Sequence, residues 1–203
     1  MTAARVSLGD HDAATLATLD SLAVVHIMTD KYGEAEEVLL EALEGWRASP
    51  SGSIGEFGTM TNLANLYRRQ QQFDKAEALH GQVLIEKRRL FGDQDVRTLN
   101  SINNLACAHM YAKSYTDAKP LFEEALAGYR EFYLAEHRDT LKVMHRLGYT
   151  LARLAEFDDA RLLLQEALDG YRKRSVRSSS ASIQREIDSI EQILGYVDSQ
   201  LPK

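Results

Sequence analysis

Hydrophobic positions recur along the chain in one arrangement that is written four times. Four aromatic residues lie 41, 42 and 42 positions apart: Tyr32, Phe73, Tyr115 and Phe157. An alanine follows each aromatic after three residues, and an apolar-plus-small pair such as Leu105-Ala106 stands ten positions before it. Unrelated sequence does not keep one register over four copies, so the pattern predicts an internal repeat of about 42 residues.

Each repeat is expected to form two helices. Met60, Leu63 and Tyr67 fall on one helical face before an aromatic, and Ala118 and Phe122 begin a second face after one. A lone helix pair cannot bury its apolar face, so the pairs must stack. The pattern therefore predicts an all-α solenoid with four units, expected at about 10–47, 56–89, 92–133 and 136–174.

Polar residues at the expected helix starts predict N-caps. Asp12, Ser53 and Asp95 precede first helices, whereas His137 breaks this pattern and Asp139 is the expected substitute. For the second helices, the expected caps directly follow the aromatics: Gly33, Asp74, Thr116 and Asp158.

The segments flanking the four units have less regular patterns. Residues 1–9 are either the tail of a truncated repeat or a disordered start. Residues 175–181 form a basic, serine-rich linker, in which Ser175 and Ser178 follow arginines and offer an alternative reading as a phosphorylation segment. Residues 182–198 carry an apolar stripe typical of a capping helix, with a partner-binding helix as the alternative.

The third unit resembles the tetratricopeptide repeat in its 42-residue, kinesin-light-chain-like form. The matching residues are Thr98-Leu99, Asn103-Asn104-Leu105-Ala106, Tyr115, Ala118, Pro120 and Glu124-Ala125-Leu126. The resemblance covers about residues 8–173. It implies a right-handed solenoid with a C-terminal capping helix, and inner-face asparagines that hold the backbone of a bound peptide.

Net charge, cysteine content and the length of apolar runs argue against several classes of function. The net charge is −6 and the sequence pI is about 5.5, which argues against general binding to nucleic acid or to anionic membranes. Cys107 is the single cysteine, so neither an intramolecular disulfide nor a cysteine-rich metal cluster is expected. No apolar run approaches the ~18 residues of a membrane span. We expect a cytoplasmic chain without cofactors or metals.

The helix face opposite the core is the candidate binding surface. It is rich in amides in the middle of the chain and basic in the fourth unit, and it comprises Asn62, Asn65, Arg69, Asn100, Asn103, Asn104, Tyr111, Lys142, His145, Arg146, Tyr149 and Arg153. Amides can pair with an extended peptide backbone, and arginine or lysine can bind acidic side chains. Val24 and Met28 add apolar surface in the first unit. The alternative is that these residues cover a solvated face and brace neighbouring units.

Candidate catalytic groups are scarce in the sequence. Cys107 and His109 are two positions apart and point to different helix faces, and His26 and His109 are expected in the core. The sequence thus predicts a non-enzymatic adaptor or scaffold that binds an extended acidic peptide with an apolar anchor, as a monomer or with weak self-association. The alternative is a segment of a larger array that self-associates through uncapped ends. A hydrolase would require titratable groups that converge in the groove.

Overall fold

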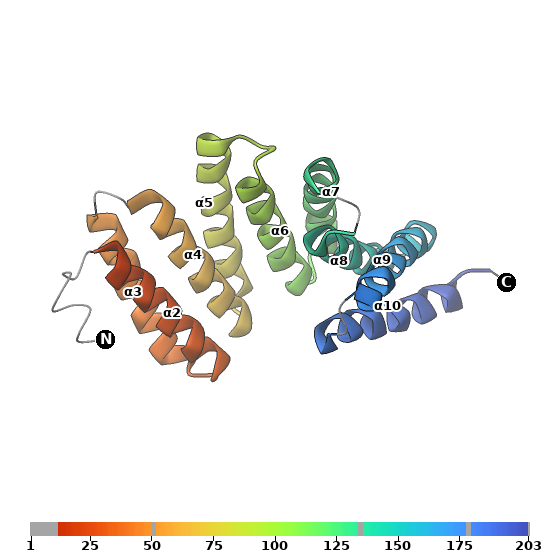
Figure 1. Cartoon of the computed structure of the whole chain (residues 1–203), viewed down its shortest axis with the longest axis horizontal. Helices are drawn as coiled ribbons and strands as arrows, with labels where there is room; N and C mark the ends of the chain where they lie inside the picture. The colour runs from red at the N-terminus through yellow and green to blue at the C-terminus, as the bar shows by residue number, and fades with distance from the viewer. Residues whose placement is uncertain (1–11, 50–51, 134–135, 178–179, 203) are drawn as a thin grey trace. The chain divides into compact units, whose positions relative to one another are not determined.

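The computed structural model describes residues 12–49, 52–133, 136–177 and 180–202. Over these residues the chain has nine α-helices and no strand, which confirms the all-α prediction (Figure 1). The helices are α2 (Ala13–Met28), α3 (Tyr32–Ala48), α4 (Gly52–Arg69), α5 (Phe73–Phe91), α6 (Val96–Tyr111), α7 (Tyr115–Phe132), α8 (Arg138–Arg153), α9 (Phe157–Arg177) and α10 (Ala181–Gln200). The expectations for residues 1–9 and for Ser178 lie outside the described residues.

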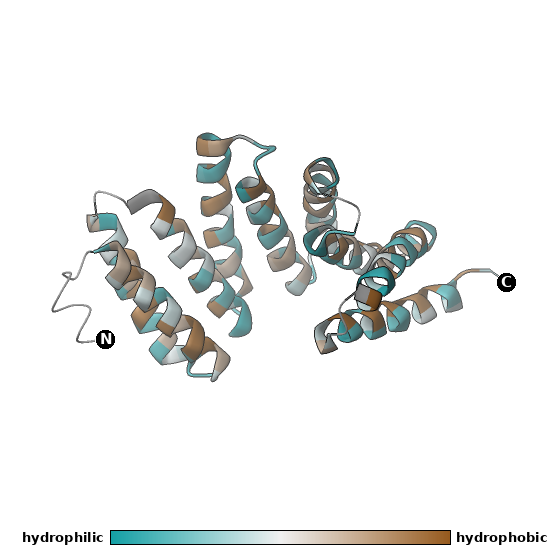
Figure 2. Ribbon diagram, viewed as in Figure 1, coloured by the Kyte–Doolittle hydropathy of each residue, from teal (hydrophilic) through white to brown (hydrophobic). Residues whose placement is uncertain are grey.

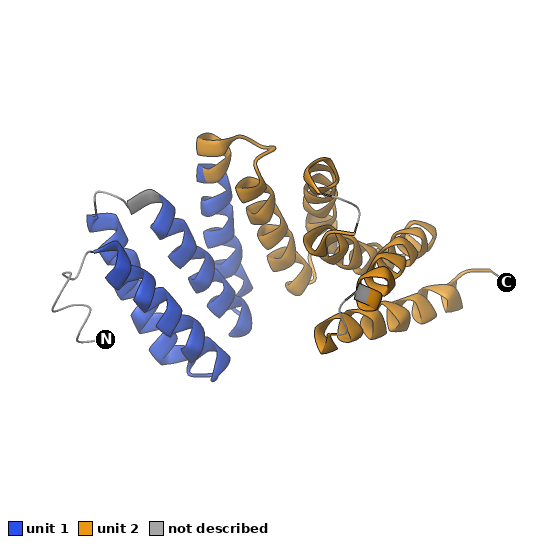
Figure 3. Ribbon diagram, in the orientation of Figure 1, with its two compact units in different colours: residues 1–86 blue, residues 87–203 orange. Residues whose placement is uncertain are grey.

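The chain forms two compact units, residues 1–86 and residues 87–203 (Figure 3). In the first unit, α2 packs against α3, α3 against α4, and α2 against α4. Its core includes Leu39 and Leu66, which are fully buried, and Trp46, which packs with Leu16 and Leu19. The core face predicted for α4 is confirmed, because Met60, Leu63, Ala64 and Tyr67 are buried.

In the second unit, each helix from α6 to α10 packs against the next one along the chain. The first helices of successive pairs also touch, because α8 contacts both α6 and α10. This double contact, to the partner helix and to the next pair, is how stacked helix pairs bury a continuous core. The largest fully buried side chains include Phe122, Tyr129, Met144 and Tyr171. Figure 2 shows apolar and polar residues alternating along the helices, as this packing requires.

Two of the four predicted caps of the first helices are confirmed, and Ser53 is not a cap because α4 begins before it, at Gly52. Asp12 and Asp95 accept hydrogen bonds at 2.8 Å from the backbone N–H of Ala14 and Arg97. At α8 the cap is His137 and not Asp139, because His137 Nδ1 accepts from the backbone N–H of Asp139 at 3.3 Å. An imidazole nitrogen thus takes the place of a carboxylate oxygen.

The predicted caps of the second helices were wrong, because these helices begin one residue earlier, at the aromatic itself. Gly33, Asp74, Thr116 and Asp158 therefore lie inside the helices. The reason is the turn between the two helices. A residue with positive φ lies two positions before each aromatic and reverses the chain: Asp30, Gln71, Lys113 and Ala155.

The C-terminal region is more helical than the sequence pattern suggests. α9 continues through Ser175 to Arg177, into the segment expected as a linker. α10 begins at Ala181 and is capped by Ser180, whose Oγ accepts from the backbone N–H of Ser182 at 3.2 Å. Ile187, Ile190, Leu194 and Val197 of α10 are buried, and α10 packs on α9 and α8. It covers the end of the described stack.

Candidate functional site

The predicted binding residues of the first unit lie on α4. Asn62 is half-buried, and its amide donates a weak hydrogen bond at 3.5 Å to Asp20 of α2. Thr59 donates to the same carboxylate at 2.8 Å. Burial raises the pKa of Asp20, and these hydrogen bonds partly oppose that rise. Asn62 therefore braces α4 against α2, while Asn65 is half-buried and Arg69 is exposed.

The predicted asparagines of α6 also take part in contacts between helices. Asn100 Oδ1 accepts from the Tyr129 hydroxyl of α7 at 2.5 Å. Asn103 Oδ1 accepts from Arg146 Nη1 of α8 at 3.1 Å. The bracing alternative thus describes Asn62, Asn100 and Asn103. A peptide-holding role for Asn65 and Asn104 stays a prediction, and Asn104 is half-buried on α6.

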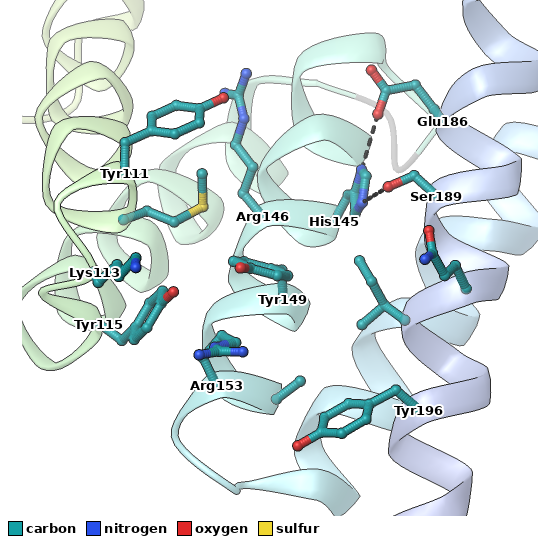
Figure 4. A pocket seen from close by; sticks show the side chains of 14 residues that line it. Tyr111, Lys113, Tyr115, His145, Arg146, Tyr149, Arg153, Glu186, Ser189 and Tyr196 are labelled. Atoms are coloured by element: carbon teal, nitrogen blue, oxygen red, sulfur yellow. Dashed lines mark hydrogen bonds and ion pairs between the residues drawn. The ribbon is translucent and has the colours of Figure 1, made fainter. Parts of the chain in front are cut away.

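A hollow of about 660 Å³ lies in the second unit, bordered by the end of α6, the start of α7, α8 and α10 (Figure 4). We call it the tyrosine hollow. Five predicted residues line it: Tyr111, His145, Arg146, Tyr149 and Arg153. Lys142 is half-buried on α8 but is not among the lining residues. The structure therefore brings together most of the basic stripe of the fourth repeat and one residue of the third.

Sequence reasoning missed the other residues that line the tyrosine hollow, which are Met110, Lys113, Tyr115, Ala152, Glu186, Ser189, Gln192, Ile193 and Tyr196. A signal for those on α10 was present. The buried Ile190 and Leu194 correspond to Leu147 and Leu151 of α8 with an offset of 43 residues. The same offset carries Arg146, Tyr149 and Arg153 onto three of the missed residues, namely Ser189, Gln192 and Tyr196.

Aromatic and cationic groups meet on one side of the hollow. The rings of Tyr115 and Tyr149 pack edge to face with centroids 6.1 Å apart. The guanidinium of Arg153 lies 5.4 Å from the centre of the Tyr115 ring, within cation–π range. A hydrogen bond with Tyr115 raises the pKa of Tyr149, and burial adds to the rise, so the phenol stays neutral at physiological pH.

A second cluster links α8 to α10 on the opposite side of Figure 4. His145 Nδ1 lies 2.9 Å from Glu186 Oε2, and its Nε2 lies 3.2 Å from Ser189 Oγ. The hydrogen bond from His145 lowers the pKa of Glu186, although burial opposes the shift. His145 therefore has a polar partner at each of its two ring nitrogens.

The two histidines expected in the core lie at its margin. His26 is 18% exposed, with Nδ1 3.0 Å from Glu34 Oε2, and His109 is half-buried. A core placement was therefore too simple for His26, whose ring contacts a carboxylate, whereas His109 keeps Nδ1 buried. Among the described residues, no group of three or more histidine, cysteine or acidic side chains is placed to hold a metal ion.

The described helices include none with the length and apolar character needed to cross a membrane. This result concerns the described residues alone.

The chain resembles several solved structures in fold. The putative kinesin light chain of Podosopora anserina, with nearly identical TPR-like repeats, matches with a TM-score of 0.74 and 21% identity over 91% of this chain and 89% of that one. BtubC (BKLC) from P. vanneervenii matches with a TM-score of 0.70 and 17% identity, covering 92% and 80%. The apo form of RapI matches with a TM-score of 0.72 and 14% identity, covering 91% and 69%.

Sequence comparison gives the family directly. No curated protein sequence matches the chain. Models of the tetratricopeptide repeat, however, match residues 15–49, 56–131 and 103–173, which together make up more than half of the chain. The matched segments contain all four aromatics that define the repeat spacing, and the solved structures share the stacked helix-pair fold. The chain therefore belongs to the tetratricopeptide repeat family.

Proposed function

We propose that this chain is a protein-interaction module that binds an extended peptide in the tyrosine hollow, in an adaptor or scaffold role. The tetratricopeptide repeat fold supports interaction with other proteins in general. The observation that best supports peptide binding is the hollow itself. It combines cationic, aromatic and apolar groups, most of them from the first helices α6, α8 and α10. A volume of about 660 Å³ fits several side chains of a peptide and not a folded domain.

The cations of the hollow indicate an acidic partner. Lys113, Arg146 and Arg153 all line it, in a chain whose net charge is −6. Within the described part of the chain, none of the three forms an ion pair with a carboxylate: Arg146 bonds to the neutral Asn103, and Arg153 lies over an aromatic ring. Their charge is available to the aspartate or glutamate side chains of a ligand.

The apolar groups of the hollow provide a place for an anchor. Ile193 and Ala152 contribute aliphatic surface, and Tyr196 contributes a ring that is 49% exposed. Aromatic side chains bury large areas at interfaces and lose little entropy when they become ordered. A peptide with one apolar or aromatic residue beside acidic residues matches this lining.

The proposal is tested by fluorescence anisotropy with a panel of labelled peptides, at low and at high salt. The panel contains acidic peptides with an aromatic anchor, the same peptides with the anchor changed to alanine, and basic counterparts. We expect binding to be strongest for the first group and to weaken at high salt, because salt screens exposed charges. Equal binding of the basic counterparts would contradict the proposal.

A second candidate function is assembly of this chain into a longer stack. Three exposed apolar residues favour it, because Val24, Val25 and Met28 of α2 are 39%, 54% and 72% exposed. An apolar face on a first helix can receive another helix pair. Sedimentation equilibrium tests this candidate: a dimer that the substitution Val25→Glu disrupts would support it, and a monomer at high concentration would exclude it.

A further inference from the structure

Ser189, His145 and Glu186 lie in line on the wall of the tyrosine hollow (Figure 4). Glu186 and Ser189 are one turn apart on α10, so both side chains point to the same side of that helix. His145 reaches toward them from α8. Its ring lies 2.9 Å from the glutamate oxygen and 3.2 Å from the serine oxygen.

The chemistry of the partners sets the tautomer of His145. A carboxylate can only accept a hydrogen bond, so the Nδ1–H of the imidazole donates to Glu186. A neutral imidazole then carries a lone pair on Nε2, and the Ser189 hydroxyl donates to it. The serine proton therefore points at a base whose other nitrogen is held by a carboxylate, which is the order of nucleophile, base and orienting acid in serine hydrolases.

The surroundings of these residues suit a reaction as well as a structural contact. All three side chains line an open hollow of about 660 Å³, whereas a contact that only braces two helices needs no access to solvent. Gln192, one turn after Ser189, and Arg146, next to His145, line the same hollow. The amide N–H of Gln192 is the candidate side-chain donor to a developing oxyanion, whereas the Arg146 guanidinium points toward Tyr111 in Figure 4.

We propose that Ser189 is a nucleophile that takes an acyl group from small activated esters and passes it to water, with His145 as general base and Glu186 as positioning residue. This proposal does not rest on peptide binding. The proposal departs from the sequence-based expectation of a chain without enzymatic activity. Its reason is that His145, Glu186 and Ser189 converge on the hollow, as the titratable groups of a hydrolase must.

The steps balance with water as the only co-reactant. The Ser189 oxygen bonds to the ester carbonyl carbon while its proton passes to His145 Nε2. The tetrahedral adduct collapses, the carbon–alkoxide bond breaks, and the imidazolium returns the proton to the leaving alcohol. Water then attacks the acyl-serine with His145 as base, which releases the carboxylic acid and restores the serine hydroxyl.

The reaction is expected to be slow. Ser189 lies inside α10, where the backbone N–H groups around it are used in the helix, so they cannot form a backbone oxyanion hole beside the serine. Loss of one oxyanion donor costs about 10²- to 10³-fold in rate in a serine protease. A covalent probe that records a single turnover is therefore the more sensitive readout.

The test incubates the whole chain with a fluorophosphonate probe and maps the adduct by mass spectrometry. We expect one adduct, on Ser189, and no adduct on that residue in urea-unfolded protein. In parallel, p-nitrophenyl acetate should give acetyl-Ser189 and release p-nitrophenol. An adduct on another residue, or no adduct in the folded chain, would overturn the proposal without bearing on peptide binding.

Substitutions distinguish a catalytic role of these residues from a purely structural one. Ser189→Ala should abolish labelling, and the matched control Ser182→Ala, on an exposed serine of the same helix, should leave it unchanged. Glu186→Gln should reduce the labelling rate by at least about tenfold and change its pH profile, because an amide can hold the wrong tautomer. Circular dichroism shows whether each variant is folded. Labelling at the wild-type rate in Glu186→Gln would show that the three residues only connect the helices.

Discussion

Leu99 of α6 packs directly on the backbone of Gly128 in α7, so closely that a β-carbon at position 128 would collide with the leucine side chain. The same arrangement recurs at Leu16 with Gly45 and at Leu141 with Gly170. The leucine of each Thr-Leu motif thus fills the space that the missing side chain of the glycine leaves near the end of the second helix. This contact sets how closely the two helices of a repeat approach.

Gly128→Ala should therefore destabilise the second unit. Leu99 is 1% exposed, so its side chain must repack within the core to admit the added methyl group. This should cost about 1–3 kcal/mol. Gly195→Ala is the control, because nothing lies within 4 Å of a β-carbon there and alanine favours the helix by about 0.5–1 kcal/mol. Urea unfolding followed by circular dichroism measures both. Equal stability of Gly128→Ala and wild type would show that the contact is loose.

The turn before α9 offers a site for stabilisation. Ala155 has a φ of 61°, a left-handed conformation that costs alanine about 1 kcal/mol more than glycine. Ala155→Gly should raise the free energy of unfolding by about that amount. The same change at exposed Ala127, inside α7, should lower it by about 1 kcal/mol. Opposite signs of the two effects in thermal unfolding support the account, and a common sign contradicts it.

α10 should contribute strongly to stability. Ile190 is fully buried where α10 meets the rest of the second unit. Ile190→Ala removes these contacts and should lower the free energy of unfolding by about 2–5 kcal/mol. The exposed Gln184 gives a surface control on the same helix through Gln184→Ala. If Ile190→Ala melted at the wild-type temperature, α10 would be an appendage and not a cap.

Acid should weaken the second unit through Glu186. Hydrogen bonding to His145 holds the pKa of this carboxyl below its ordinary value of 4.5, so the folded state favours the charged form. Its contribution to stability is complete above the unfolded pKa, and it is lost as the pH falls through the lower folded pKa. Glu186→Gln should therefore lower the melting temperature at neutral pH but not at strongly acidic pH.

The comparison with wild type isolates this effect. Asp20 acts in the opposite sense, because burial raises its pKa, but it is present in both proteins and cancels in the difference. Melting temperatures measured across the acid range would contradict the account if the gap between wild type and Glu186→Gln stayed constant.

Sequence patterns predicted the repeat architecture well and the site only in part. The aromatic spacing and the apolar faces are local periodicities, so they give the fold class and the core of α4 directly. The start of α7 was misplaced because Lys113 turns the chain, and a lysine gives no sign of its positive φ.

The residues of the candidate site come together through contacts between positions that are far apart in the sequence. Asn103 meets Arg146 across 43 residues, and His145 meets Glu186 across 41, and no local pattern reports such pairs. The lining residues of α10 were missed for a simpler reason, because residues 182–198 were interpreted as a capping helix and only its apolar stripe was considered.

The most direct test of the central claim is a charge reversal in the tyrosine hollow. Arg153→Glu and Arg185→Glu change the net charge equally, but Arg153 lines the hollow and the exposed Arg185 of α10 does not. Fluorescence anisotropy with the tightest acidic, aromatic-anchored peptide should show at least about tenfold weaker binding for Arg153→Glu and near wild-type binding for Arg185→Glu. Equal affinities of the two variants would contradict peptide binding in this hollow.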